Sequence, residues 1–210
     1  MRLTKERAAQ NRGEILDTAT QLFKTQGIDS VSVADLMKAA GFTHGGFYNH
    51  FESKAELAVE AIRYAFEQSL TELEARVIGS ETPFAAMADA LAYYVAPEHR
   101  DEAAGGCPTG SLPVDVGRQA PDAQAAFADG LEKYIDLVSR YGGSNGSVDR
   151  ECGIGILSTV VGAIILSRAV RRGRPDLSDE ILAAARATRA PIALDRPQPA
   201  DSKRRTKSSA

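Results

Sequence analysis

Few side chains in this sequence could carry covalent or metal chemistry: two cysteines, Cys107 and Cys152, and three histidines, His44, His50 and His99. The histidines do not have the spacing of metal ligands, and the cysteines lack the paired spacing of a zinc site. The glycine-rich segments match neither a phosphate-binding loop nor a dinucleotide-binding turn, and no nucleophile elbow occurs. The sequence therefore predicts no metal, no cofactor and no enzyme.

Cys107 is the reactive side chain with the most unusual surroundings, a Gly- and Pro-rich segment over residues 103–113. A thiol there could be modified by oxidants or electrophiles. A free cysteine is more often a small buried hydrophobic residue, as we expect for Cys152 on a buried helix. A thiol-based stress sensor, or a helical enzyme, that uses Cys107 is therefore kept as the alternative function. A disulfide between the two cysteines is not expected in a reducing compartment.

A second group of polar residues follows a short helix that we expect to begin after Ser32. Ser32 can cap the first turn of this helix, with Asp35 three residues further on. Gly41 supplies the left-handed residue that ends it. The apolar residues at helical spacing between these ends are Val33, Leu36, Met37 and Ala40.

Thr43 can cap a second helix immediately afterwards. Phe47 and Phe51 lie four residues apart and would face the core. This leaves four residues on an outer face: His44, Gly45, Tyr48 and Asn49. Ser53 and Glu56 form a further capping signal, so a third helix begins at once. Two short helices joined by a glycine turn, the second with a polar outer face, indicate a helix-turn-helix.

With these residues the chain resembles the TetR family of bacterial transcriptional regulators. The resemblance covers roughly the first quarter to third of the chain, and it rests on Ile15, Ala19, Leu22, Phe23, Gly27, the segment 41–51, Lys54 and Leu57. It implies DNA contacts from Thr43, His44, Gly45, Tyr48, Asn49, His50 and Lys54, and we include Ser32 in the predicted DNA-binding set.

The predicted DNA contacts are of two kinds. The hydroxyls of Thr43 and Tyr48 and the ammonium group of Lys54 suit phosphate oxygens, which position a protein on DNA. His44 and Asn49 would reach base edges in the major groove. Family members often carry Lys or Arg where this chain has His44, so its uncharged imidazole predicts weaker sequence-independent affinity.

The helix-turn-helix requires elements that fix its orientation. A first helix from Gly13 to Gly27 would be its scaffold, after a frayed polar tail over residues 1–12 with four basic side chains and one acidic one. A long helix from Lys54 to about Ile78 would connect it to the remaining helices. We therefore expect an all-α fold with a helix-turn-helix DNA-binding domain over residues 1–53, a helical effector-binding and dimerisation domain over 54–190, and a disordered basic tail over 191–210.

Apolar residues at helical spacing predict further helices over residues 84–95, 121–142, 154–170 and 177–187. The run from Ile154 to Val170 is the most apolar, but it is short and rich in Gly, Ser and Thr for a membrane span. One chain covers only one flank of such a helix, so we expect the other flank to meet a second copy in a four-helix dimer interface. A membrane-associated helical protein is the rival interpretation.

Aromatic, Met and Cys residues of this second domain could line a ligand cavity. An alternative interpretation is that they belong to the hydrophobic core. The predicted ligand-binding residues are Phe66, Met87, Leu91, Tyr94, Cys107, Phe127 and Tyr134.

The length, composition and net charge of the chain limit these predictions. A chain of 210 residues that is 43% hydrophobic can bury a sizeable core. Its formal net charge of −3 requires the positive charge that meets DNA to be local. No leader sequence is evident, so we expect a cytoplasmic protein. The sequence predicts a homodimeric, ligand-responsive regulator, a repressor released from palindromic double-stranded operator DNA by a small-molecule effector or by modification of Cys107.

Overall fold

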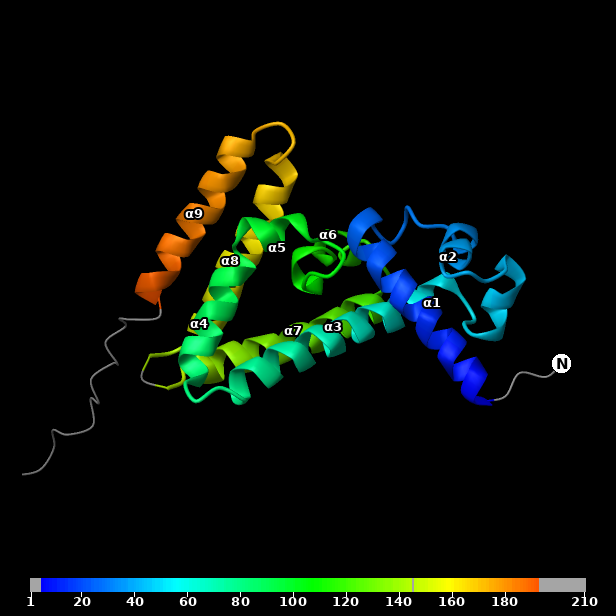
Figure 1. The fold of residues 1–210 in the computed structure, drawn as a ribbon, viewed down its shortest axis with the longest axis horizontal. Coiled ribbons are helices and arrows are strands. Elements are labelled where there is room, and N and C mark those ends of the chain that lie inside the picture. The colour runs from blue at the N-terminus through cyan, green and yellow to red at the C-terminus, as the bar shows by residue number, and fades with distance from the viewer. Residues whose placement is uncertain (1–4, 145, 193–210) are drawn as a thin grey trace, which may run out of the picture.

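The computed structural model describes residues 5–144 and 146–192 (Figure 1). Its first elements are α1 (Lys5–Gln26), α2 (Val33–Ala39), the 3-10 helix η1 (His44–Asn49) and α3 (Lys54–Ile78). They are followed by α4 (Pro83–Tyr94), α5 (Pro97–Asp101), the 3-10 helix η2 (Pro108–Gly110), α6 (Pro113–Val116), α7 (Pro121–Tyr141), α8 (Arg150–Val170) and α9 (Pro175–Ile192). No β-strand occurs within these described ranges, and the predicted all-α class is confirmed.

The helices form two connected parts (Figure 1). α1, α2 and η1 lie at one end of the molecule, and α3 runs from them into the second part, where it packs along α7. α8 and α9 pack against each other on the opposite side. The long α3 therefore links the two parts without a flexible segment.

Helix ends follow the capping chemistry of the sequence. The hydroxyls of Ser32 and Ser53 accept the backbone N–H of the residue three positions on, at the starts of α2 and α3. Gly27 and Gly41, at φ +86° and +80°, adopt the left-handed conformation that ends α1 and α2.

The N-terminal prediction was wrong in one respect, because α1 begins at Lys5 and residues 5–12 are helical. Side-chain hydrogen bonds at helical spacing, from Arg7 to Gln10 (3.3 Å) and from Gln10 to Glu14 (3.1 Å), stabilise this first part. The basic segment 193–210 lies outside the described residues, whereas residues 191 and 192 end α9.

Among the described residues, α8 alone is long and apolar enough to cross a membrane, by length and composition only. It packs between α7 and α9. The core helix of a water-soluble protein has the same composition, so α8 is weak evidence for a membrane protein.

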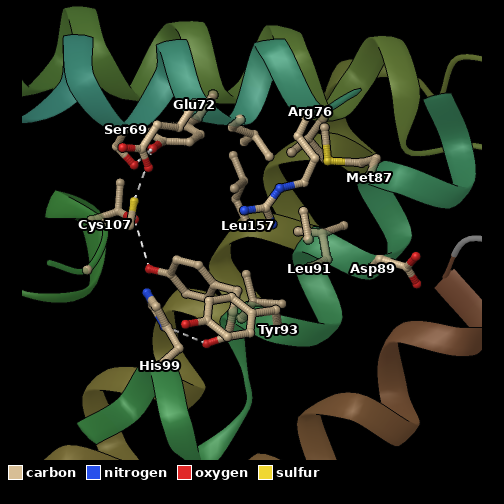
Figure 2. A pocket seen from close by; sticks show the side chains of 18 of the residues that line it. Ser69, Glu72, Arg76, Met87, Asp89, Leu91, Tyr93, His99, Cys107 and Leu157 are labelled. Atoms are coloured by element: carbon tan, nitrogen blue, oxygen red, sulfur yellow. Dashed lines mark hydrogen bonds between the residues drawn. The ribbon is translucent and has the colours of Figure 1, made fainter. Parts of the chain in front are cut away.

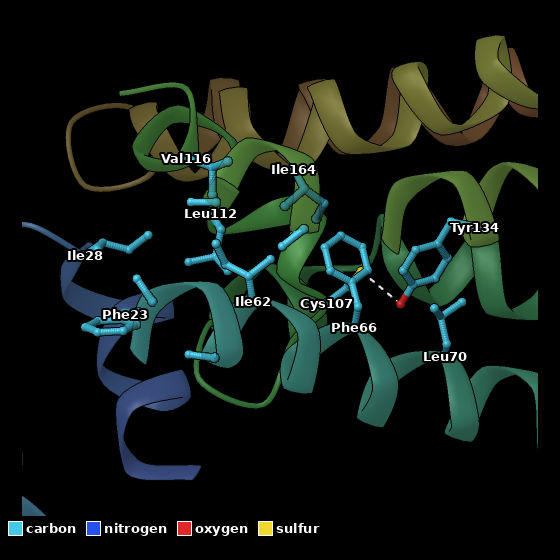
Figure 3. Packing of buried hydrophobic residues seen from close by; sticks show 14 of the residues in the cluster. Phe23, Ile28, Ile62, Phe66, Leu70, Cys107, Leu112, Val116, Tyr134 and Ile164 are labelled. Atoms are coloured by element: carbon cyan, nitrogen blue, oxygen red, sulfur yellow. Dashed lines mark hydrogen bonds between the residues drawn. The ribbon is translucent and has the colours of Figure 1, made fainter. Parts of the chain in front are cut away.

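The core of the second part includes a close approach of α3 to α7. Phe66 is 2% exposed, and its ring lies beside that of Tyr134, with the centroids 5.8 Å apart (Figure 3). The centroid of the Phe127 ring lies 5.1 Å from that of Phe66. At Gly130 of α7, a Cβ atom would lie within 2.2 Å of the Phe66 ring. Only glycine therefore fits at this helix crossing.

Gly130→Ala is expected to lower the free energy of unfolding by about 1–3 kcal/mol, because the added methyl group overpacks the core. Chemical denaturation measures this loss. Gly13→Ala is the control, since a Cβ at Gly13 meets nothing within 4 Å on α1 and should instead stabilise by about 0.5–1 kcal/mol. Equal stability of Gly130→Ala and the unaltered protein would contradict the packing described.

Candidate nucleic-acid interface and ligand cavity

Aromatic side chains packed in the core stabilise the helix-turn-helix. Phe47 of η1 is fully buried, and its ring stacks on Phe51 with centroids 5.6 Å apart. Leu36 and Met37 of α2 are buried in the same core. The apolar face predicted from the sequence thus packs η1 against α2.

The opposite face of η1 is open. Tyr48 is 65% exposed, and the side chains of Thr43, His44 and Asn49 are exposed as well. Gly45 is exposed, and a Cβ there would meet nothing within 4 Å. This exposed surface therefore carries two hydroxyls, an imidazole and an amide, together with Gly45, which has no side chain.

The second helix differs from its prediction in two ways. It is a 3-10 helix of six residues, and Thr43 precedes it without a side-chain capping hydrogen bond. Gly45 and Gly46 explain the difference, because adjacent glycines disfavour a regular α-helix. The Thr43 hydroxyl consequently remains available to another partner.

The remaining predicted contact residues lie at the edges of this surface. Lys54 Nζ donates to the carbonyl of Asp29 at 3.3 Å, and both Lys54 and His50 are half-buried. Ser32 is exposed, with its hydroxyl 2.6 Å from a carboxylate oxygen of Asp35. All eight predicted positions therefore lie on η1 or immediately beside α2, η1 and the start of α3, and each is exposed or half-buried.

Arg12 serves the interior of this domain. Its guanidinium pairs with Glu60 of α3 and lies 4.4 Å from the ring centroid of Phe51. Glu60 is also the first cause of the raised pKa of Arg12. Arg12 thus holds α1 to the end of the recognition segment, and it adds less to the basic edge than its charge suggests.

A cavity of about 630 Å³ lies between α3, α4, α7 and the segment before η2 (Figure 2). Five of the seven predicted ligand residues line it: Met87, Leu91, Tyr94, Cys107 and Tyr134. Phe66 does not line it and packs against Gly130 instead, and Phe127 lines a smaller cavity between α7 and α8. The mixed apolar and polar walls suit a small organic molecule.

One end of the cavity carries a continuous series of hydroxyl and thiol groups. Ser69 Oγ lies 2.6 Å from the Tyr134 hydroxyl, which lies 3.3 Å from Cys107 Sγ. Thr109 Oγ1 lies 3.0 Å from Cys107 Sγ and 2.9 Å from the Tyr94 hydroxyl. We call these five residues the hydroxyl–thiol network; Figure 2 labels Ser69 and Cys107, and Figure 3 shows the contact between Cys107 and Tyr134.

Two cavity-side residues were missed from the sequence. Arg168 of α8 donates to the carbonyls of His99, Arg100 and Gly110 and to the hydroxyl of Ser111. His99 is buried in the cavity wall, and its ring lies 4.6 Å from that of Tyr94. The available signal for Arg168 was an arginine in the last turn of a helix that is apolar over most of its length.

Burial lowers the pKa of His99 below its ordinary 6.5. Its Nδ1–H donates to the Tyr94 carbonyl at 2.8 Å, which opposes this shift without reversing it. At pH values between the lowered pKa of His99 in the folded protein and its ordinary pKa of 6.5, the unfolded chain binds more protons than the folded protein. The stability contributed by neutral His99 is therefore lost as the pH falls below about 6.5.

The free energy of unfolding of the His99→Gln variant should depend less on pH between pH 7 and 5 than that of the unaltered protein. Chemical denaturation at both pH values measures this difference. An unchanged pH dependence would contradict a buried neutral His99.

The cavity is connected to the helix-turn-helix by direct contacts. Lys24 at the end of α1 donates to the carbonyl of Gly106, beside Cys107, at 3.1 Å. Gln119, after α6, donates to the Asp29 carboxylate at 2.9 Å. A change in the cavity wall at Gly106 would therefore reach the end of α1 through Lys24.

A three-helix core, a left-handed glycine turn and an exposed polar second helix define a helix-turn-helix protein of the DNA-binding class. Residues 15–61 match the family model described as bacterial regulatory proteins, tetR family. This sequence match lies in the N-terminal part of the chain, whose helix-turn-helix is therefore of the tetR type.

Comparison with individual proteins agrees. The transcriptional regulator AcrR of Shigella flexneri is 42% identical over 73 residues, which are 35% of this chain and 34% of AcrR. The matched region thus spans about a third of the length of this curated relative. The crystal structure of Escherichia coli NemR in its reduced form covers 87% of this chain and 96% of that one, with TM-score 0.72 and 22% identity. Bacillus subtilis FadR in complex with stearoyl-CoA covers 86% and 97%, with TM-score 0.61 and 14% identity. These two structures share the fold.

Proposed function

We propose that this protein is a homodimeric, ligand-responsive, sequence-specific DNA-binding regulator of transcription. It would act as a repressor that leaves a near-palindromic operator when an effector binds. The observation that carries the proposal is the exposed polar face of η1 on a rigid three-helix core. Such a regulator would work in the cytoplasm, and the family model and the relative that the N-terminal part matches are both described as regulators.

Different residues of the exposed surface would contact the DNA backbone and the bases. The hydroxyls of Thr43 and Tyr48 would donate to phosphates at the groove edge, and Lys54 would add positive charge there. His44 and Asn49 would contact base edges. Gly45 lies among them with open space above it, which permits the η1 backbone to approach the major groove.

A second copy would cover the free face of α8. Ile154 and Leu166 are 41% and 58% exposed on this helix. A Cβ at Gly155 or Gly162 would meet nothing within 4 Å in the protomer. Large apolar residues beside small ones suit a closely crossing helix, and two-fold pairing through α8 and α9 would hold two recognition helices at a fixed separation.

The effector would act by selecting one arrangement of the two domains. It would bind in the 630 Å³ cavity, whose wall contacts α1 through Lys24. To change the DNA-bound population from 99:1 to 1:99, it must prefer the released arrangement by about 5.5 kcal/mol.

Modification of Cys107 is a second route to the same release. Its thiol lines the cavity and bonds to Thr109 and Tyr134, so a group added to Sγ would break both contacts. The Cys107→Ser variant tests this route. If an oxidant or electrophile releases DNA from the variant as it does from the unaltered protein, modification of Cys107 is ruled out as the cause of release.

Selection of bound duplexes from a random pool tests the proposal. We expect recovery of one near-palindromic sequence, with binding that weakens as salt increases. Recovery of unrelated duplexes even at low salt would contradict sequence-specific regulation.

A further inference from the structure

The hydroxyl–thiol network has one more proton than its hydrogen bonds use. Five groups contribute five O–H or S–H protons, and four hydrogen bonds join them in series. Each bond takes one proton, because a hydroxyl or thiol has a single donor. One donor therefore remains.

The geometry at Cys107 fixes where this donor lies. The Cys107 thiol donates to the Tyr134 oxygen, so Thr109 must donate to the sulfur, and Tyr94 must in turn donate to Thr109. Ser69 and Tyr134 then hold two protons for the single bond between them. The remaining O–H belongs to one of these two residues, both of which line the cavity.

The tyrosines of the network stay protonated. Burial raises the pKa of Tyr134 and of Tyr94 well above the ordinary value of 10. The two tyrosines therefore contribute neutral hydroxyl groups to the network and no phenolate charge.

The charged groups around the cavity disfavour an anion. Arg168 and Lys24 keep their positive charges but are not among the residues that line the cavity, and they donate to protein carbonyls and a hydroxyl instead. At the mouth, the carboxylates of Glu72, Asp89 and Glu102 outnumber the guanidinium of Arg76. The local potential there is consequently negative.

We infer that the effector is a neutral, largely apolar molecule with an acceptor oxygen, such as a ketone or ester, that accepts a hydrogen bond from Ser69 or Tyr134. The middle of the cavity supplies its apolar contacts through Leu73, Met87, Leu91 and Leu157. The inference rests on the proposed regulator function and specifies its ligand.

Three two-ring probes that differ in one group test this inference. 2-Acetylnaphthalene carries a ketone, 2-isopropenylnaphthalene has CH2 in place of the carbonyl oxygen, and 2-naphthoate is an anion. Titration calorimetry should give about five-fold tighter binding of the ketone than of the alkene, the net effect of one hydrogen bond. The naphthoate should bind more weakly than the ketone.

A double variant, Ser69→Ala with Tyr134→Phe, removes both candidate donors and leaves the weaker thiol. It should bind ketone and alkene within about two-fold of each other. Tyr94→Phe is the matched control, because Tyr94 lies at the opposite end of the network and its proton is used by Thr109; the five-fold preference should persist in it.

Equal binding of ketone and alkene by the unaltered protein, tighter binding of naphthoate, no binding of any probe, or a preference that survives in the double variant would each overturn the inference. The probe comparison needs no variant to be decisive. Binding of the selected duplex, measured on the same protein samples, is independent of these outcomes. Its loss would count against the regulator function, and its retention beside a failed probe test would count against the ligand class alone.

Discussion

The Gly45→Glu variant is expected to bind the selected duplex more than about 100-fold more weakly than the unaltered protein, which corresponds to a loss of about 2.7 kcal/mol. Gly45 lies on the exposed face of η1, and a Cβ there meets nothing within 4 Å, so the new side chain does not disturb the fold. The carboxylate would instead occupy the space between the η1 backbone and DNA and face phosphates of like charge. Fluorescence anisotropy of a labelled duplex measures the change.

Thr71→Glu controls for charge. Thr71 is exposed on α3, seventeen residues after Lys54 and so about 25 Å further along the helix. The Thr71→Glu variant adds the same carboxylate at this distance from Lys54. Its affinity for the duplex should stay within about two-fold of that of the unaltered protein, because screening by salt reduces charge interactions beyond about 10 Å. A Gly45→Glu protein that binds like the Thr71→Glu protein would show that η1 does not enter the groove.

Gly162→Glu is expected to produce a folded monomer. A Cβ at Gly162 meets nothing within the protomer, but the glutamate would bury a charge where two copies of α8 cross. Loss of pairing removes bivalent binding, so affinity for a duplex with two half-sites should fall about 100-fold or more, whereas affinity for a single half-site should change little. Sedimentation and anisotropy measure the two effects.

Thr71→Glu again provides the matched comparison and should remain a dimer with full affinity. If Gly162→Glu sediments as a dimer and binds both half-sites, the second copy does not cover this face of α8.

Local signals in the sequence were sufficient for most helix boundaries. Ser32, Gly41 and Ser53 each act through atoms within a few residues, so the ends of α2 and the start of α3 could be predicted. The 3-10 form of η1 could not, because apolar spacing alone does not distinguish it from an α-helix of the same length. The first turns of α1 were missed because the polar composition of residues 5–12 gave no apolar stripe.

The cavity was harder to predict than the fold. The residues Met87, Leu91, Tyr94, Cys107 and Tyr134 come together from distant parts of the chain, and their types alone fit a core equally well. Phe66 has the same chemical type but is enclosed by the contact at Gly130, which is visible only after α3 and α7 are packed. The network of Ser69, Thr109 and their neighbours depends on the same packing.

Footprinting on the selected duplex, together with the number of chains bound per duplex, tests the central claim most directly. Two chains per duplex, with protection in two successive major grooves about 34 Å apart on one face of the DNA, is the predicted result. One chain per duplex, or uniform protection without a preferred sequence, would contradict the account of a paired regulator that reads DNA through η1.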